Sequence, residues 1–296
     1  MSHAVNAEPR ERVAYRCICC GQENLHKSPA ILMPFIAHRV FDWQPIEITE
    51  AWGLRTIANG HAHALCNSLY CPACDFLFLD LRFSDAEMAR LYADYRGEAY
   101  VTLRERYEPG YRERNARLIA GEPYLAEVEA FIQPWIPREP IVLDWGGDSG
   151  RNSPFRDRCR RLDVLDISNN PTLPGIGRVD QESARRQCYD VIVCSQVLEH
   201  VPYPGEVLQD LRRCMQANTV LYVEVPRETL MQDEHGADIV SRKRHWHEHI
   251  NFFSGTSLDV MLRRSGFAPI TIQVADIATE TGTAQHFRIL ARPVHE

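Results

Sequence analysis

Two pairs of cysteines near the start of the chain have the spacing of metal ligands. Each pair has the form Cys-x-x-Cys, and the pairs are Cys17 with Cys20 and Cys71 with Cys74. Four thiolates form a closed tetrahedral zinc site that leaves no position for a substrate. We therefore predict a structural Zn2+ held by these four cysteines, with buried free thiols as the alternative. Substitute ligands within the same segment are Cys19, Cys66, His61 and His63.

A second group of candidate residues follows a buried apolar run. The segment IVLDWGGDSG (141–150) carries Asp144 before three glycines, and glycine lets a backbone pass close to a ligand. About twenty residues further on, VLDIS places Asp166 at the end of the next apolar run, where a carboxylate can accept both hydroxyls of a ribose. These residues predict a nucleotide-like site. The alternatives are a tight turn at the glycines and a helix cap at Asp166.

Histidines form the third group. In RHWHEHINFFSGTSL (244–258) three histidines alternate at positions 245, 247 and 249. Histidine is the natural general base near neutral pH, so His249 and His247 are catalytic candidates, with His200 a weaker one. Two other interpretations remain. The histidines can fill a loop under the sheet, or they can bind a catalytic metal, because alternate residues of a strand share one face.

The elements around these residues predict a doubly wound α/β fold. After Pro140, apolar runs alternate with turn and helix signals, which is typical of a parallel sheet with crossover helices. The first crossover helix must be short, because few residues separate the first two strands. The alternation ends with two adjacent strands. One expected helix begins near Pro204 and another spans Ser257–Ser265. The expected strands are Ile141–Trp145, Asp163–Ile167, Tyr189–Ser195, Thr219–Val225, Ile270–Val274 and Phe287–Ala291.

The chain divides into three expected units. Residues 1–83 hold six of the ten cysteines and little helical periodicity, so we predict a β-rich zinc module there. Residues 84–139 form a helical connector: Ser84 and Glu87 make a capping-box pattern, and a second helical stretch from Tyr111 to Phe131 is interrupted around Gly121 and Pro123. Residues 140–296 form the catalytic domain.

Composition excludes several classes of protein. The N-terminus has no signal-peptide pattern and no stretch of about 18 apolar residues occurs, so we expect a cytoplasmic protein without a membrane span. The 33 basic and 40 acidic side chains give a net charge of -7, which argues against a nucleic-acid partner.

The segment 141–293 resembles the class I S-adenosylmethionine (SAM)-dependent methyltransferases. DWGGDSG resembles their first motif, and VCSQVLEHV (193–201) resembles the stretch after their fourth strand. The resemblance implies a mostly parallel seven-stranded sheet and SAM as cofactor. Asp148 departs from the pattern, because it stands where the family usually has its middle glycine. The implied SAM-binding residues are Asp144, Gly146, Gly147 and Gly150 near the methionine part, Asp166 and Ile167 at the ribose, Asp180 and Gln181 beside the adenine, and Ser195 and Gln196 closing the pocket.

The N-terminal part is similar to the zinc-binding segment of bacterial sugar C-methyltransferases. The shared features are the cysteine pairs, DFLFLD (75–80) and LYADYRG (91–97), and the histidine segment resembles their Tyr-His-Glu-His stretch. That resemblance implies His249 as the base. Trp246 stands where those enzymes have the tyrosine, and indole cannot exchange a proton in that role. Their C-terminal domain is not expected here.

We therefore predict transfer of a methyl group from SAM to a small polar acceptor, such as a sugar, a nucleotide-sugar or a glycan end. Methylation of oxygen or nitrogen is at least as plausible as methylation of carbon. One alternative is a non-enzymatic zinc adaptor with a degenerate SAM fold. Another is a nucleic-acid methyltransferase.

Overall fold

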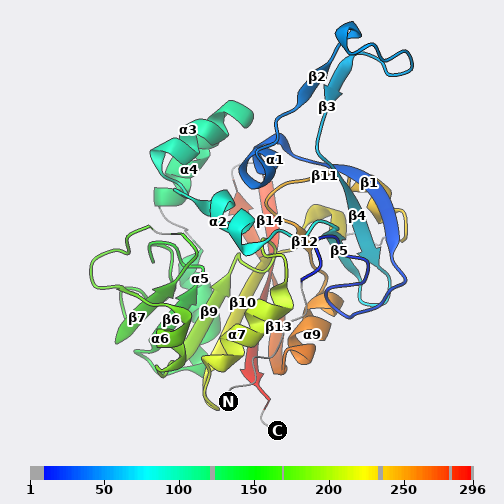
Figure 1. Ribbon diagram of the computed structural model, residues 1–296. Coiled ribbons are helices and arrows are strands. Elements are labelled where there is room, and N and C mark those ends of the chain that lie inside the picture. Colours follow the sequence, from blue (N-terminus) through cyan, green and yellow to red (C-terminus); the bar gives the residue numbers. More distant parts are fainter. Residues whose placement is uncertain (1–9, 121–123, 169, 233–235, 280–281, 295–296) are drawn as a thin grey trace, which may run out of the picture.

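A seven-stranded sheet forms the centre of the larger part of the molecule (Figure 1). The structure is a computed structural model that describes residues 10–120, 124–168, 170–232, 236–279 and 282–294. The strand order is β13-β14-β10-β9-β6-β7-β8, and all neighbours from β10 to β8 are parallel. The strands are β6 (Ile141–Trp145), β7 (Arg161–Leu165), β8 (Gly177–Arg178), β9 (Val191–Ser195), β10 (Val220–Pro226), β13 (Phe267–Thr279) and β14 (Gly282–Pro293).

Helices cover both faces of this sheet. Its central strands are almost continuous apolar runs, as expected of strands buried on two sides. Leu143, Ile192 and Leu221 point to one face and share a core with α6, α7 and α9, whereas Val142 and Val193 point to the other and pack on α5. The helices are α5 (Leu125–Ile132), α6 (Gln181–Arg185), α7 (Pro204–Arg213) and α9 (Gly255–Arg264), with the 3-10 turn η2 (Gln133–Trp135) after α5.

The predicted doubly wound fold is therefore confirmed as a mixed sheet, since β14 is antiparallel to both β10 and β13. Two local expectations were wrong. Residues 146–160, all of which the structure describes, form turns and no helix, because only a short chain joins β6 to β7. The second strand begins and ends two residues earlier than expected, since its pairing starts at Arg161 opposite Ile141.

A second sheet is assembled from two distant parts of the chain. Its order is β11-β1-β4-β5-β12. Three strands come from the cysteine-rich segment, and the two outer strands come from the histidine segment. The strands are β1 (His26–Leu32), β4 (Leu65–Cys71), β5 (Phe76–Leu79), β11 (His245–Trp246) and β12 (Asn251–Phe252). The N-terminal segment therefore holds the backbone on both sides of His247 and His249.

The N-terminal segment also contains a helix that the sequence pattern did not predict. Helix α1 (Pro34–Phe41) has proline at its first position and four buried residues, so tertiary packing stabilises it despite its short length. A hairpin of β2 (Ile46–Ile48) and β3 (Gly60–Ala62), with η1 (Glu50–Trp52) between its strands, projects away from the body of the molecule (Figure 1).

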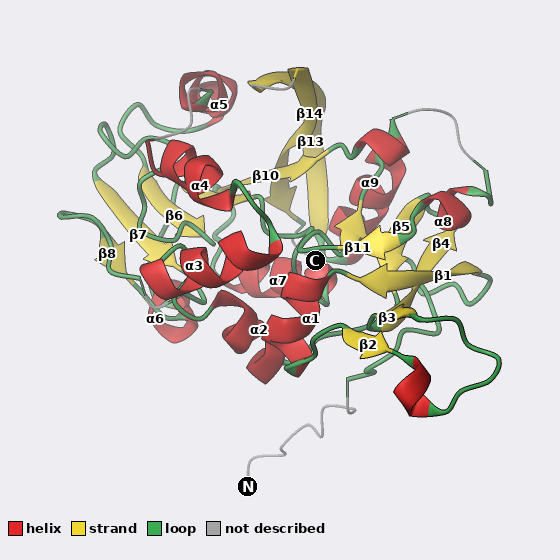
Figure 2. Ribbon diagram, turned by 90° about the horizontal axis from the view of Figure 1, so that it is seen from above, coloured by secondary structure: helices red, strands yellow, loops and turns green. Residues whose placement is uncertain are grey.

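The connector is helical, as predicted. The side chains of Ser84 and Glu87 form the expected capping box at the start of α2 (Asp85–Tyr92). Helices α3 (Glu98–Tyr107) and α4 (Tyr111–Ala120) follow, and the predicted interruption at Gly121 and Pro123 lies outside the described residues. In the view from above, α3 and α4 lie on the viewer's side of the sheet (Figure 2). The remaining elements are η3 (Thr229–Met231) and α8 (Ile239–Arg242).

None of the helices in the described ranges has the length and hydropathy needed to cross a bilayer.

Candidate active site

A cavity of about 450 Å³ opens at the carboxyl ends of β6, β7 and β9. The chain runs outward from β6 to β7 and β8, then returns to form β9 on the other side of β6, so the cavity lies where the strand order reverses. Open α/β sheets bind their ligands at this point. Predicted residues that line the cavity are Gly146, Asp166, Ile167, Gln181, Gln196 and His200.

The glycine loop after β6 leaves no room for side chains. Gly146 has φ +87°, and a Cβ atom there would lie 2.4 Å from Cγ2 of Val197. Gly150 has φ +79°, and its Cβ would lie 2.5 Å from Cδ1 of Ile176. Both positions therefore require glycine, but for different reasons: Gly146 lines the cavity, whereas Gly150 packs against the segment before β8.

Asp144 does not line the cavity. Its side chain is 5% exposed, accepts a hydrogen bond from the Ser153 hydroxyl, and lies against Gly147, whose Cβ would be 2.4 Å from the carboxylate. Burial raises the pKa of Asp144 to about 6, while the Ser153 hydrogen bond acts in the opposite direction. In this geometry Asp144 supports the glycine loop from beneath.

Asp166 reaches the cavity and also holds the loop. Its carboxylate accepts backbone N–H bonds from Asp148 at 2.8 Å and from Ser168 at 2.6 Å. Asp148 itself has φ +53°, the left-handed conformation that aspartate tolerates better than most residues. This explains how aspartate can stand at a position where the family usually has glycine.

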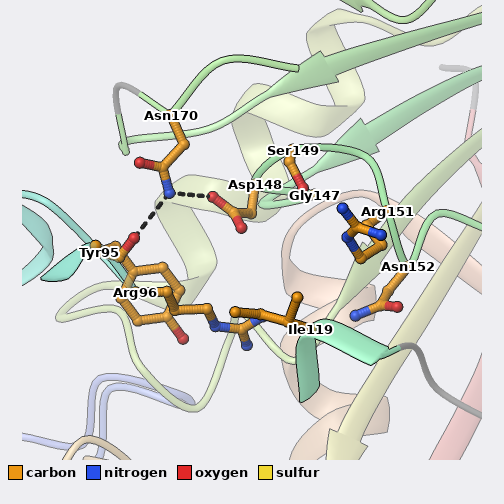
Figure 3. A pocket seen from close by; sticks show the side chains of 10 residues that line it. Tyr95, Arg96, Ile119, Gly147, Asp148, Ser149, Arg151, Asn152 and Asn170 are labelled. Atoms are coloured by element: carbon orange, nitrogen blue, oxygen red, sulfur yellow. Dashed lines mark hydrogen bonds between the residues drawn. The ribbon is translucent and has the colours of Figure 1, made fainter. Parts of the chain in front are cut away.

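A smaller hollow of about 280 Å³ lies on the other side of the glycine loop, and Tyr95 lines both spaces. Figure 3 shows the amide of Asn170 between Asp148 and the backbone of Tyr95, and it donates to both, at 2.7 and 2.8 Å. Gly147 lines this hollow and not the larger cavity. The connector before α3 is thereby tied to the glycine loop.

The remaining predicted cofactor residues separate into two groups. Gln196 lines the cavity in a left-handed conformation (φ +56°), and its amide donates to Oε1 of Glu224 at 3.2 Å. Ser195 does not line it, because its hydroxyl donates to the same buried carboxylate at 3.1 Å. Asp180 is exposed and accepts the Ser183 N–H at 2.7 Å as the N-cap of α6, while its neighbour Gln181 lines the cavity.

Substitution of Asp180 by alanine tests this placement. We expect the loss of the N-cap to lower the free energy of unfolding by about 1 kcal/mol, and SAM affinity to stay unchanged. Thermal unfolding and calorimetric SAM titration measure the two effects. A large loss of affinity would instead place Asp180 at the adenine.

The three alternating histidines do not converge. His245 is exposed in β11, and His247 directs Nε2 to Oε1 of Glu108 at 2.5 Å. His249 instead meets His200, with ring centroids 4.7 Å apart in an edge-to-face arrangement. β11 ends at Trp246, so the alternation of faces does not continue to His249. Among the described residues no common metal site unites the three. His200 lines the cavity, and His249 packs against its ring.

A buried ion pair orients the histidine segment. Glu248 binds Arg104 of α3 through two hydrogen bonds of 2.8 Å and accepts a third from the Tyr100 hydroxyl at 3.0 Å. Both charged side chains are largely buried. Sequence reasoning missed this pair, because no local signal links residues 144 positions apart.

The four predicted zinc ligands come together. Their four Sγ atoms all lie within 4.8 Å of one another. The Sγ–Sγ distance is 3.6 Å between Cys17 and Cys74 and 3.5 Å between Cys20 and Cys71. Tetrahedral zinc–thiolate bonds of about 2.3 Å place sulfurs about 3.8 Å apart, so the arrangement fits such an ion. Of the substitute ligands, Cys66 is in a different core cluster, and His61 and His63 are not part of the group. Cys19 lies beside Cys17 and Cys74, and its thiol also donates to the Ser257 carbonyl at 3.3 Å. None of the ten cysteines forms a disulfide.

The mixed sheet, the cavity at its reversal point and the glycine loop beside it fit a class I methyltransferase-like fold. The chain belongs to the methyltransferase domain family, whose model matches residues 111–272, more than half of the sequence. It is a SAM-dependent methyltransferase.

Two solved structures are among those similar to this chain. One is 1,6-didemethyltoxoflavin-N1-methyltransferase of Burkholderia thailandensis (17% identity, 67% of this chain and 90% of that chain, TM-score 0.47). The other is magnesium protoporphyrin IX methyltransferase of Synechocystis PCC 6803 (15% identity, 65% of this chain and 99% of that chain, TM-score 0.42). Similarity at this level says nothing about the acceptor. A comparison with curated proteins found no match.

Proposed function

We propose that this enzyme methylates a small polar acceptor, namely a sugar, a nucleotide-sugar or a glycan end. The observation that carries the proposal is the contact between His200, which lines the cofactor cavity, and His249, which packs against it. The same wall carries Tyr92 and Tyr95, and Arg10 and Asp85 also line the cavity. Aromatic faces with charged and hydrogen-bonding groups suit a hydroxyl-rich acceptor better than an apolar one.

The cavity also fits the cofactor. Asp166 has carboxylate lone pairs beyond its two backbone bonds and would accept the ribose hydroxyls, with Ile167 beside it. Gly146 and Gln196 would lie along the methionine part, and Gln181 would lie near the adenine. We assign Asp144, Gly147, Gly150, Asp180 and Ser195 to the support of these elements, on the contacts described above.

SAM supplies an electrophilic methyl group on a sulfonium, so the chain must align the acceptor and receive its proton. The acceptor atom bonds to the methyl carbon while the methyl–sulfur bond breaks toward sulfur, which leaves a neutral thioether. In this proposal His249 orients the acceptor atom or takes its proton. Its Nδ1 is held by Oε1 of Glu228 at 2.6 Å, so Nε2 is the nitrogen left for this task.

The position of Trp246 favours an oxygen or nitrogen acceptor. Its side chain is fully buried, and its indole N–H donates to the Ser68 hydroxyl at 2.9 Å. It therefore offers no acid–base group at the position where the similar sugar C-methyltransferases have tyrosine. Carbon methylation beside a keto group needs a carbanion, whereas an oxygen or nitrogen nucleophile needs only a proton acceptor.

We also propose structural zinc on Cys17, Cys20, Cys71 and Cys74, as in the N-terminal segment of those enzymes. Four thiolates close the coordination sphere, so the ion would not touch the acceptor. The ion would instead fix the loop that contacts α9. Next to the second cysteine pair, the carbonyl of Asp75 accepts a hydrogen bond of 2.8 Å from the hydroxyl of Ser254, the N-cap of α9. Thiolate ligation needs a reducing compartment, which supports a cytoplasmic location.

Screening activated sugars for release of S-adenosylhomocysteine (SAH) tests the acceptor class. We expect SAH only when a nucleotide-linked or terminal sugar is present, and the mass of the product should increase by one methyl group. Turnover restricted to DNA or RNA would contradict the proposal. If calorimetry detected no SAM or SAH binding at high micromolar concentration, the chain would be an adaptor and not an enzyme.

A further inference from the structure

Three side chains outside the cysteine cluster gather beside the cofactor cavity. Glu199 and His200 lie in the turn after β9, and His249 lies between β11 and β12. One potential ligand atom of each lies within 4.8 Å of the others. The backbone holds the two segments together, since the Glu199 carbonyl accepts N–H bonds from Ile250 at 2.7 Å and Asn251 at 3.1 Å.

Both imidazoles are held through the same ring nitrogen. Nδ1 of His249 contacts the Glu228 carboxylate at 2.6 Å, and Nδ1 of His200 contacts the carbonyl of Glu248 at 3.1 Å. A carbonyl only accepts hydrogen bonds, so His200 carries its proton on Nδ1 and presents Nε2 as a lone pair. Histidines that bind metal ions almost always have a carboxylate or carbonyl on their other nitrogen.

Glu199 is the unusual member of the group. It is 1% exposed, and neither carboxylate oxygen has a hydrogen-bond partner among the described residues. Its Oε1 lies 3.7 Å from Nε2 of His200. A buried carboxylate without a partner is costly, and a cation bound beside it would remove that cost. Metal–ligand bonds of about 2.0–2.2 Å place adjacent ligand atoms about 3–3.5 Å apart, close to this separation.

We propose that Glu199, His200 and His249 bind one divalent first-row cation such as Mn2+ or Fe2+. Two imidazoles and one carboxylate are the ligand set of open sites that keep positions for water or substrate. The site differs from the cysteine cluster in its ligands, none of which is sulfur, and in its coordination sphere, which stays open. Unlike the three alternating histidines of the sequence prediction, it draws only His249 from that segment.

The inference rests on the proposed function and gives the ion a role in it. His200 lines the cavity, so an ion on this ligand set would bind an acceptor oxygen directly and lower the pKa of its hydroxyl. The hydroxyl proton passes to water, the oxygen bonds to the methyl carbon, and the methyl–sulfur bond breaks to give SAH. His249 then acts as a ligand and orients the acceptor through the ion.

Mn2+ titration of the full chain, with SAH bound and zinc kept in the cysteine cluster, tests the site. Mn2+ favours oxygen and nitrogen ligands over thiolates, so electron paramagnetic resonance reports this site alone. We expect one bound Mn2+ per chain with couplings to two histidine nitrogens. Glu199→Gln and His200→Ala should each weaken binding at least about tenfold, because even the loss of a group that supports a metal ligand lowers affinity by about 10–100-fold.

His245→Ala is the matched control, because His245 belongs to the same segment but is exposed and outside the group. It should bind Mn2+ like the unmodified protein. SAH titration checks that each variant is folded, and the nitrogen couplings of the unmodified protein decide the question even if a variant unfolds. Absence of bound Mn2+ at millimolar concentration, or equal binding by all variants, would overturn the inference. Methyl transfer by metal-free protein would leave the proposed function standing, with His249 as base.

Discussion

Replacing Cys71 by serine is expected to release zinc and unfold the five-stranded sheet. Structural zinc contributes about 10–16 kcal/mol of apparent binding free energy in small zinc domains, which exceeds the net stability of most domains. Cys71 is the last residue of β4, and β5 follows within a few residues, so losing the ion frees both strands. Strand β12, which belongs to the histidine segment, pairs with β5, and methyl transfer should therefore be lost as well.

Metal analysis and amide hydrogen exchange measure this effect. The zinc content should fall from one ion per chain to none, and exchange should increase in β1, β4, β5, β11 and β12 together. Cys188→Ser is the matched control, because Cys188 is exposed and outside the cluster. A metal-free Cys71 variant that keeps native exchange protection in β4 and β5 would show that the ion is dispensable for this sheet.

Replacing Asp166 by alanine is expected to weaken SAM binding at least about tenfold, since a charged hydrogen-bond acceptor is worth about 1.5–3 kcal/mol. Two losses combine. The ribose hydroxyls lose their proposed acceptor, and the backbone amides of Asp148 and Ser168 lose the carboxylate that holds them. Calorimetric titration with SAM and SAH measures the affinity.

Asp166→Asn separates these two contributions. Its amide carbonyl can still accept one backbone N–H, so the loop is partly held while the charge is gone. We expect an intermediate affinity for this variant. Asp157→Ala is the control, because Asp157 is an exposed aspartate on the connection between β6 and β7 and does not line the cavity. Unchanged affinity of the alanine variant would remove Asp166 from the cofactor site.

Local patterns were sufficient for most strands of the main sheet and for the candidate zinc ligands. The strand Ile141–Trp145 and the helix beginning at Pro204 have the predicted limits, since a buried apolar run and a proline at the first helical position are local signals. The cysteine pairs converge as their spacing predicted. These features were readable in this way because each depends on neighbours a few residues away.

The histidine segment was harder to interpret, because its surroundings come from distant parts of the chain. The alternation at 245, 247 and 249 suggested a common face, but β11 is short and each histidine finds a different environment. The partners that decide their roles are Glu108 for His247, and Glu228 with His200 for His249. None of these partners follows from the sequence around the histidines.

The sequence by itself determined the class of protein, the strand segments along the chain after Pro140, the glycine loop and the candidate zinc ligands. Only the tertiary structure decided that Asp144 supports the loop while Asp166 lines the cavity, that residues 245–252 complete the N-terminal sheet, and that Glu199 lies unpartnered beside two histidines. The physical reason is the separation along the chain over which each kind of interaction acts. Propensity, capping and loop strain act between near neighbours, whereas burial and long-range pairing depend on the whole packed chain.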